Sequence, residues 1–403
     1  MNPGIANQDR LPRLRLPGNG VYALFVLFFG ILTLWVPGYW PVAAFHLGAF
    51  SLFAATFYRD AGALRRGAPP VPLCALGLAA LWGGFQLLTG RTVVTFDTAT
   101  SALSWAALFA MFLAGIGLFE DPPTRIAFRE AMLWFTSVVS AVATLQLFTS
   151  GGKIFWIFPS GYVDNVMGPI LNPNHYAAWI ELILPIALFE AFTRRHNALL
   201  YAAMAAAMYA SVVSSGSRAG AILCTAELIL VPVLVSARGL APLRAAGSAL
   251  VKLAAALAAF TAVVGWEVIW KRLTMPDPFF MRRELVVSSL QMIRDRPWLG
   301  FGLGAWPTVY PAYAIFDTGL LANRAHNQWL EWAADGGIPF ALLLLAVAVW
   351  AVRPAFRTVW GVGVISVFLH SLVDYPLQRP QLAAWAIVLI AMLAAADRDI
   401  DAV

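Results

Sequence analysis

The sequence predicts an all-α polytopic membrane protein, and three observations support this fold class. Of the 403 residues, 60% are hydrophobic and 12% are charged, whereas a soluble domain carries about 25% charged residues. Apolar runs close to the length of a membrane-spanning helix, about 20 residues, recur along the chain. The 31 glycines and 25 prolines are also tolerated in membrane helices. Together these observations exclude a secreted enzyme, a nucleic-acid-binding protein and a disordered chain.

Twelve apolar runs are candidate spanning helices. Nine of them precede the one long polar stretch of the sequence, and three follow it. The runs are 21–36, 38–57, 71–89, 100–119, 130–149, 175–193, 198–213, 219–235, 248–268, 338–352, 357–372 and 382–396. We therefore expect about twelve transmembrane helices, with nine over 21–268 and three over 338–396.

The distribution of basic residues predicts the orientation of these helices. If the N-terminus is cytoplasmic, the inner tails and loops carry 15 basic residues, and the short outer loops carry only Arg91, Lys153, Arg218 and Arg379. An excess of arginine and lysine is typical of the cytoplasmic side. We expect the N-terminal tail 1–20 and the C-terminal tail 397–403 to be cytoplasmic.

The polar stretch 269–337 is then a long loop domain on the outer side. Its segment 285–293 has the pattern of an amphipathic helix. The glycines of 300–304 indicate a flexible turn, and a second helix around 327–334 is expected to stop at Gly336-Gly337. The outer domain is therefore predicted to be partly helical.

Five polar clusters lie on the predicted outer side, at the ends of spanning helices or in the outer loop domain. They are Asn172-Pro173-Asn174-His175, Ser214-Ser215-Gly216-Ser217-Arg218-Ala219-Gly220, Met281-Arg282-Arg283-Glu284, Arg324-Ala325-His326-Asn327 and His370-Ser371-Leu372-Val373-Asp374-Tyr375. Each cluster also has an ordinary structural interpretation, such as a helix start, a headgroup anchor or a solvated face. His370 and Asp374, four residues apart, can share one helix face.

The residue types in these clusters suit a phosphate-bearing substrate and an acceptor hydroxyl. Arg218, Arg282 and Arg283 can bind phosphate oxygens in a bidentate fork without losing their charge. His326 can accept a proton near neutral pH, and Asn174 lies at a helix start that can face an anion. A lone histidine without cysteine or a second histidine nearby is not a metal site, so we expect no metal and no cofactor.

The ordered motifs resemble those of a known family. The matching segments are Gly168 to Ala178 with its Asn-Pro-Asn-His core, Ser215 to Gly220, Arg282 to Gly304, Ala325 to Pro339 and His370 to Asp374. In this order, over about residues 165–380, they are similar to the O-antigen ligase and Wzy-type polymerase superfamily of bacterial lipid-linked glycan transferases.

This resemblance implies a metal-independent, inverting glycosyltransferase of the GT-C type in the bacterial inner membrane, with its active site on the periplasmic face. Such enzymes take a glycan from undecaprenyl pyrophosphate. By the resemblance, Arg218 and Arg282 would hold the pyrophosphate and His326 would activate the acceptor hydroxyl. The adjacent Arg283 is an alternative to Arg282. Asn174, His175 and Asn327 are candidate substrate-binding residues.

The acceptor is not identified by the sequence. A ligase would transfer the glycan to lipid A–core, and a Wzy-type polymerase would extend the lipid-linked chain. A protein O-oligosaccharyltransferase is a third member of the same class. A transporter or flippase for lipid-linked sugars is the alternative of a different class, and it would require charges along a central cavity.

Overall fold

The computed structural model describes residues 16–59, 62, 69–161, 166–194, 196–241, 251, 254–255, 280–315 and 322–401. Over these residues the chain is almost entirely helical, with a short antiparallel hairpin of β1 Lys153–Ile154 and β2 Phe158–Pro159. The helices before the gap at 256–279 are α1 Gly18–Thr33, α2 Trp40–Arg59, α4 Pro70–Leu88, α5 Thr95–Leu118, α6 Pro122–Thr149, α7 Pro173–Thr193, α8 Ala198–Ser215 and α9 Arg218–Ala237. Those after it are α12 Phe280–Asp295, α13 Trp306–Val309, η1 Tyr310–Ala312, α14 Gln328–Thr358, α15 Val362–His370, η2 Pro376–Gln378 and α16 Pro380–Asp401.

Nine of the described helices are long and apolar enough to cross a membrane, and they correspond to nine of the twelve predicted runs. Helix α1 corresponds to the run 21–36, and with 16 residues it is shorter than those nine helices. The run 248–268 lies outside the described residues except for 251 and 254–255. The predicted all-α polytopic membrane fold is confirmed.

The run 357–372 differs from the prediction of a full spanning helix. Helix α15 has nine residues, and at 1.5 Å per residue it rises about 13.5 Å, less than half of a hydrocarbon core of about 30 Å. Val359, with a φ of 66°, ends α14 and starts a turn that is not helical. At the C-terminal end of α15, the backbone N–H of Gln328 donates to the carbonyl of Ser371 at 2.9 Å. This carbonyl is therefore not used to continue the helix.

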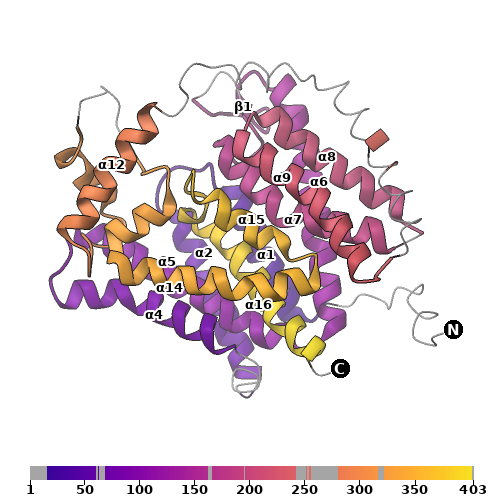
Figure 1. Ribbon diagram of the computed structural model, residues 1–403, viewed down its shortest axis with the longest axis horizontal. Coiled ribbons are helices and arrows are strands. Elements are labelled where there is room, and N and C mark those ends of the chain that lie inside the picture. Colours follow the sequence, from indigo (N-terminus) through magenta and orange to yellow (C-terminus); the bar gives the residue numbers. More distant parts are fainter. Residues whose placement is uncertain are drawn as a thin grey trace.

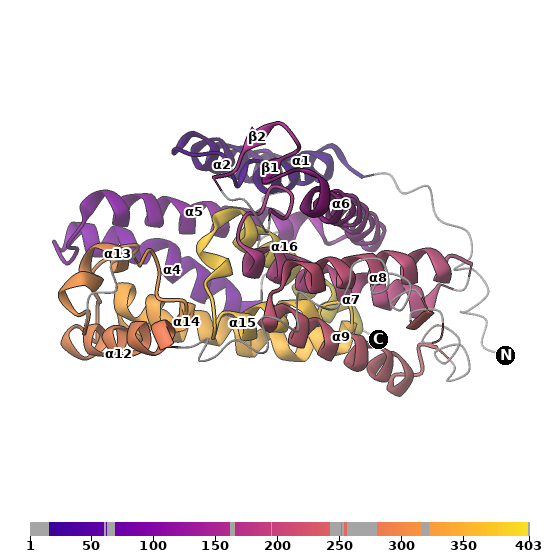
Figure 2. The same ribbon diagram turned by 90° about the horizontal axis from the view of Figure 1, so that it is seen from above.

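Helices α7 and α16 lie in the middle of the described bundle (Figures 1 and 2). In each of them, 89% of the most apolar stretch is buried inside the protein, compared with 33% in α4 and α9. A helix that is apolar on all sides is suited to such a central position. Figure 2 shows α12 and α13 at the end of the molecule opposite to α8 and α9.

The predicted outer segment packs against a break in α14. Gly337 has φ 81° and ψ 168°, which divides α14 into two helical parts as the double glycine predicted. The backbone N–H of Ile338 donates to the carbonyl of Pro297 at 2.7 Å, and that of Gly302 donates to the carbonyl of Asp335 at 2.9 Å. The turn 300–304, predicted to be flexible, is therefore hydrogen bonded to α14 and buried.

Candidate active site

Most residues of the site lie at the starts of helices, and a short polar side chain caps each of these starts. Asn172, Ser217 and Asn327 cap α7, α9 and α14, and each accepts a hydrogen bond from a backbone N–H of the first turn at 2.8 to 3.2 Å. Such caps satisfy N–H groups that have no partner inside the helix. The ordinary interpretation of these residues as helix starts therefore holds. The caps also fix the positions of the clusters that contain Asn172, Ser217 and Asn327.

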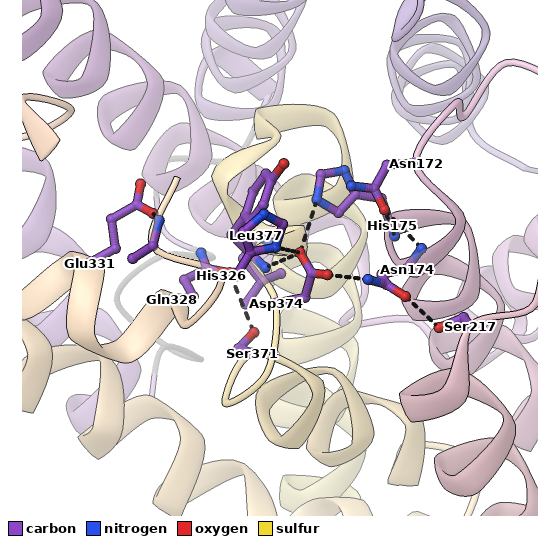
Figure 3. Close-up of polar contacts among 12 residues, drawn as sticks. Asn172, Asn174, His175, Ser217, His326, Gln328, Glu331, Ser371, Asp374 and Leu377 are labelled. Atoms are coloured by element: carbon purple, nitrogen blue, oxygen red, sulfur yellow. Dashed lines mark hydrogen bonds and ion pairs between the residues drawn. The ribbon is translucent and has the colours of Figure 1, made fainter. Parts of the chain in front are cut away.

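A chain of hydrogen bonds joins two of these starts to the turn between α15 and α16. The hydroxyl of Ser217 donates to Oδ1 of Asn174 at 2.8 Å. The Nδ2 group of Asn174 in turn donates to Oδ2 of Asp374. Segments more than 150 residues apart in sequence thus meet in one polar network (Figure 3).

Asp374 is the centre of this network. Its carboxylate has no exposed surface and lies 3.6 Å from Nδ1 of His326, 3.8 Å from Nε2 of His175 and 3.7 Å from a terminal nitrogen of Arg282. Figure 3 shows His326 and His175 on either side of the carboxylate, with Asn174 beside it. Residues from α7, α12, the segment before α14 and the turn after α15 therefore converge on one negative charge.

The surroundings keep the Asp374 carboxyl ionised. Burial by itself raises its pKa, but the imidazoles of His326 and His175 and the backbone N–H of Tyr375 outweigh burial and lower the pKa below its ordinary value. The Tyr375 N–H donates to Oδ1 at 2.8 Å. A buried carboxylate with this many donors and basic neighbours can stabilise positive charge on a nearby group.

His326 is the accessible member of the network. Its side chain is 34% exposed, whereas that of His175 is 2% exposed. The ring packs edge-to-face on Tyr375 with 5.0 Å between centroids. Its backbone adopts a left-handed φ of 48°, which is uncommon for a residue other than glycine and indicates a conformation imposed by its surroundings.

The structure gives the remaining predicted residues different positions. Arg218 is the first residue of α9, and within the described part of the chain its partly exposed guanidinium has no ion-pair partner. Arg283 is exposed on α12 beside Arg282. Asn327 uses its side-chain oxygen to cap α14, with the backbone N–H of Leu330 donating at 3.1 Å. His326 and Arg282 thus share a partner, and Arg218 follows directly after the linked residue Ser217.

Asp374 itself was not among the predicted site residues, although the His370–Asp374 pair stood out in the sequence. The two side chains take different partners. His370 Nδ1 lies 2.7 Å from Oε1 of Glu181, and both side chains are fully buried. Helix α15 ends at His370, so Asp374 lies in the following turn instead of on the same helix face. The feature of the sequence that could have indicated Asp374 is its place as a charged residue just after the end of a predicted apolar helix.

Among the described residues, no group of three or more His, Cys, Asp or Glu side chains could hold a metal ion. The site therefore offers basic and amide groups, together with one carboxylate that these groups surround. Such an arrangement can bind an anionic ligand and can accept a proton from it or from a second substrate.

Two comparisons with known proteins found sequences similar to this chain. A family model described as O-antigen ligase matches residues 202–346, which include Arg218, Arg282 and His326. The O-antigen ligase of Pseudomonas aeruginosa strain PAO1 is 26% identical over 351 residues, covering 86% of this chain and 81% of the relative. Both findings support the resemblance to the O-antigen ligase and Wzy-type polymerase superfamily that the ordered motifs indicate.

The likeness to O-antigen ligases implies a glycosyltransferase-type activity, with a lipid-linked glycan and an acceptor as partners, and the long apolar helices indicate a multi-pass membrane protein. The matched segment 202–346 contains the α8–α9 turn, α12 and the start of α14. The starts of α7 and of the turn after α15 lie outside the segment matched by the family model, yet they supply Asn174, His175 and Asp374 to the same network.

Proposed function

We propose that the protein is an O-antigen ligase-like glycosyltransferase that moves a glycan from undecaprenyl pyrophosphate to a sugar hydroxyl of lipid A–core. The observation that carries the proposal is the approach of His326 and Arg282 to the same carboxylate, at 3.6 and 3.7 Å. A proton acceptor and a fixed cation then lie on either side of one point. The names of the matching family model and of the Pseudomonas aeruginosa relative support the ligase over a transporter.

His326 is assigned the role of general base. Its Nδ1 faces Asp374, so a proton on Nδ1 leaves Nε2 as the nitrogen that accepts the acceptor's proton. As that hydroxyl oxygen bonds to the anomeric carbon, the bond from this carbon to the pyrophosphate oxygen breaks. The proton passes to Nε2, and the electron pair leaves with the lipid pyrophosphate. Asp374 stabilises the imidazolium that results.

Arg218 and Arg282 are assigned to the pyrophosphate. Arg282 is held near Asp374 with a third of its side chain exposed, and Arg218 has no ion-pair partner among the described residues. Guanidinium groups can take phosphate oxygens in pairs and neutralise charge that grows as the leaving group departs. Arg283 is the alternative to Arg282. Asn174 and Asn327 are partly exposed at helix starts and are assigned to substrate contact, and the buried His175 supports the site through Asp374.

The location proposed for this chemistry is the periplasmic face of the bacterial inner membrane, with both termini cytoplasmic. The positive-inside distribution of arginine supports this orientation. The loop domain 269–337 lies on the outer side in the same scheme. The lipid-linked donor then reaches the helix ends from within the membrane.

The acceptor is tested with purified protein and a lipid-linked glycan donor, offered lipid A–core in one reaction and a second lipid-linked unit in another. The proposal predicts glycan on lipid A–core with the wild type. His326→Ala should lower that rate by about 10²-fold or more, because it removes the general base. A longer lipid-linked chain as the product would instead identify a Wzy-type polymerase, and full activity of His326→Ala would remove His326 from the mechanism.

A further inference from the structure

A second buried carboxylate holds the segment that carries His326. Glu331, in the first turns of α14, has no exposed side-chain surface. Its Oε2 accepts a hydrogen bond from the backbone N–H of Ala325 at 2.9 Å. Its Oε1 accepts from Nη1 of Arg324 and from Nε2 of Gln378, each at 2.9 Å. The carboxylate therefore has three donors, one of them charged. Figure 3 shows where Glu331 lies relative to His326 and Asp374.

These bonds fix the backbone on one side of His326, and a different set fixes it on the other. The backbone N–H of Gln328 donates to the carbonyls of Ser371 at 2.9 Å and Asp374 at 3.1 Å. The left-handed φ of 48° at His326 costs about 1 kcal/mol or more and persists only where the neighbours determine it. Without the bond from Ala325 to Glu331, the chain before His326 would lose its anchor.

Glu331 also ties His326 to the turn that carries Asp374. Gln378, which reaches Glu331, lies three residues after Tyr375 in the same connection between α15 and α16. The side-chain oxygen of Gln328 accepts from the backbone N–H of Leu377 at 2.9 Å. Both segments that meet at the 3.6 Å contact between His326 and Asp374 are thus fastened to the first turns of α14.

The charge of Glu331 is balanced locally and not by the site. Burial lowers the pKa of Arg324, but the charge of Glu331 and its hydrogen bond outweigh burial and raise the pKa. Arg324 is therefore committed to Glu331 and does not compete with Arg218 or Arg282 for an anion. A carboxylate that accepts three hydrogen bonds inside the protein and has no exposed surface serves geometry, because a substrate cannot reach it.

We infer that Glu331 is a positioning residue for the transfer reaction, and that it holds the His326 imidazole against Asp374 in the orientation that accepts the acceptor's proton. This inference rests on the function proposed above. It predicts that replacing Glu331 slows the chemical step. Binding of the lipid-linked donor, which is assigned to the arginines, should not change.

The test is Glu331→Gln in the purified transfer assay. Glutamine keeps the shape but has a single acceptor oxygen and no charge, so at least one of the three bonds is lost. We expect kcat to fall about 10-fold to 100-fold, the scale of effect that a displacement near 1 Å has on a catalytic group, while KM for the donor stays at the wild-type value. A merely structural role would change both or neither.

Glu130→Gln is the matched control. Glu130 lies in α6, where Oε2 pairs with Nη1 of Arg194 at 3.0 Å and Oε1 accepts from the hydroxyl of Tyr201 at 2.8 Å. It thus has an arginine and a second donor, like Glu331, but at the other end of α7 from Asn174. Its kcat and KM should match the wild type.

Three results separate the possibilities. Wild-type kcat in Glu331→Gln, with His326→Ala inactive, overturns the positioning role and leaves the proposed function standing. Wild-type activity of His326→Ala removes His326 from the mechanism, and the positioning role of Glu331 falls with it. If Glu331→Gln does not accumulate in the membrane, Glu331→Asp decides: it keeps the charge that pairs with Arg324, but its shorter side chain cannot hold all three bonds, and wild-type kcat in that variant overturns the inference.

Discussion

Asp374 is the residue on which the account depends most. It is buried, and its lowered pKa keeps it ionised at neutral pH beside two imidazoles and an arginine. An ionised carboxylate in such a place orients a histidine and stabilises the charge that the histidine gains in the reaction. Asn174 and the N–H of Tyr375 supply the hydrogen bonds that hold this carboxylate in position.

Replacing Asp374 by asparagine should slow transfer with little change in protein yield. The amide has nearly the same shape but cannot stabilise the imidazolium of His326, so we expect the transfer rate to fall by about 10²-fold. The measurement is the initial rate of glycan transfer by purified protein. A rate equal to that of the wild type would show that His326 acts without this carboxylate.

The same substitution makes a prediction about pH and stability. Because the pKa of Asp374 is lower in the folded protein than the ordinary value near 3.9, its ionised form stabilises the fold above that value. The contribution is lost as the pH falls through the lower, folded pKa. The difference in Tm between wild type and Asp374→Asn in detergent should shrink as the pH falls below about 4. A difference that stays unchanged below that pH would contradict this assignment.

Among the elements, α14 connects the membrane bundle to the site. Its two parts are joined at Gly337, where an added Cβ would lie 2.3 Å from the carbonyl oxygen of Trp298. The backbone there has φ 81° and ψ 168°, a region that is accessible essentially to glycine alone. The first part of α14 carries Asn327, Gln328 and Glu331 toward Asp374, so the break determines where the His326 segment lies.

Gly337→Ala should therefore destabilise the protein by about 2 kcal/mol or more, since the nearest atoms belong to the backbone and cannot move cheaply. The apparent Tm in detergent checks this. Gly84→Ala is the control, because Gly84 lies within α4 and an added Cβ there meets nothing within 4 Å. Equal Tm values for the two variants would mean that the break tolerates a side chain.

The helices were largely predictable, and the partners of the polar residues were not. Apolar runs located the nine long helices because length and hydrophobicity determine a membrane span. The run 357–372 failed because the turns at Val359 and Ser371 shorten α15, and turns held by contacts from α14 leave no mark in the run itself. The break at Gly337 followed from the double glycine, whereas α12 extends beyond the predicted segment 285–293 at both ends.

For the site, motif order indicated His326, Arg218 and Arg282, but the central place of Asp374 could not be deduced from spacing. Four residues separate it from His370 in sequence, which suggests one helix face. Its actual neighbours come from positions 174, 175, 282 and 326. Contacts over such distances are determined by the packing of whole helices, which a single sequence does not specify.

At the scale of the whole molecule, the helix starts that meet at Asp374 must all lie on one side of the membrane. The starts of α7, α9 and α14 and the turn before α16 are joined by polar contacts of 3.8 Å or less. The positive-inside distribution of arginine predicts that this side is the periplasm. The proposed donor and acceptor require the same side, so sidedness links topology to chemistry.

The most direct test is labelling of a single cysteine at position 326. His326→Cys is combined with replacement of Cys74 and Cys224, and spheroplasts are treated with a membrane-impermeant maleimide. A parallel protein carries Arg238→Cys at the exposed end of α9, which the topology places in the cytoplasm. We predict labelling of position 326 in intact spheroplasts and labelling of position 238 only after the membrane is permeabilised. Labelling of position 326 only after permeabilisation would contradict the account.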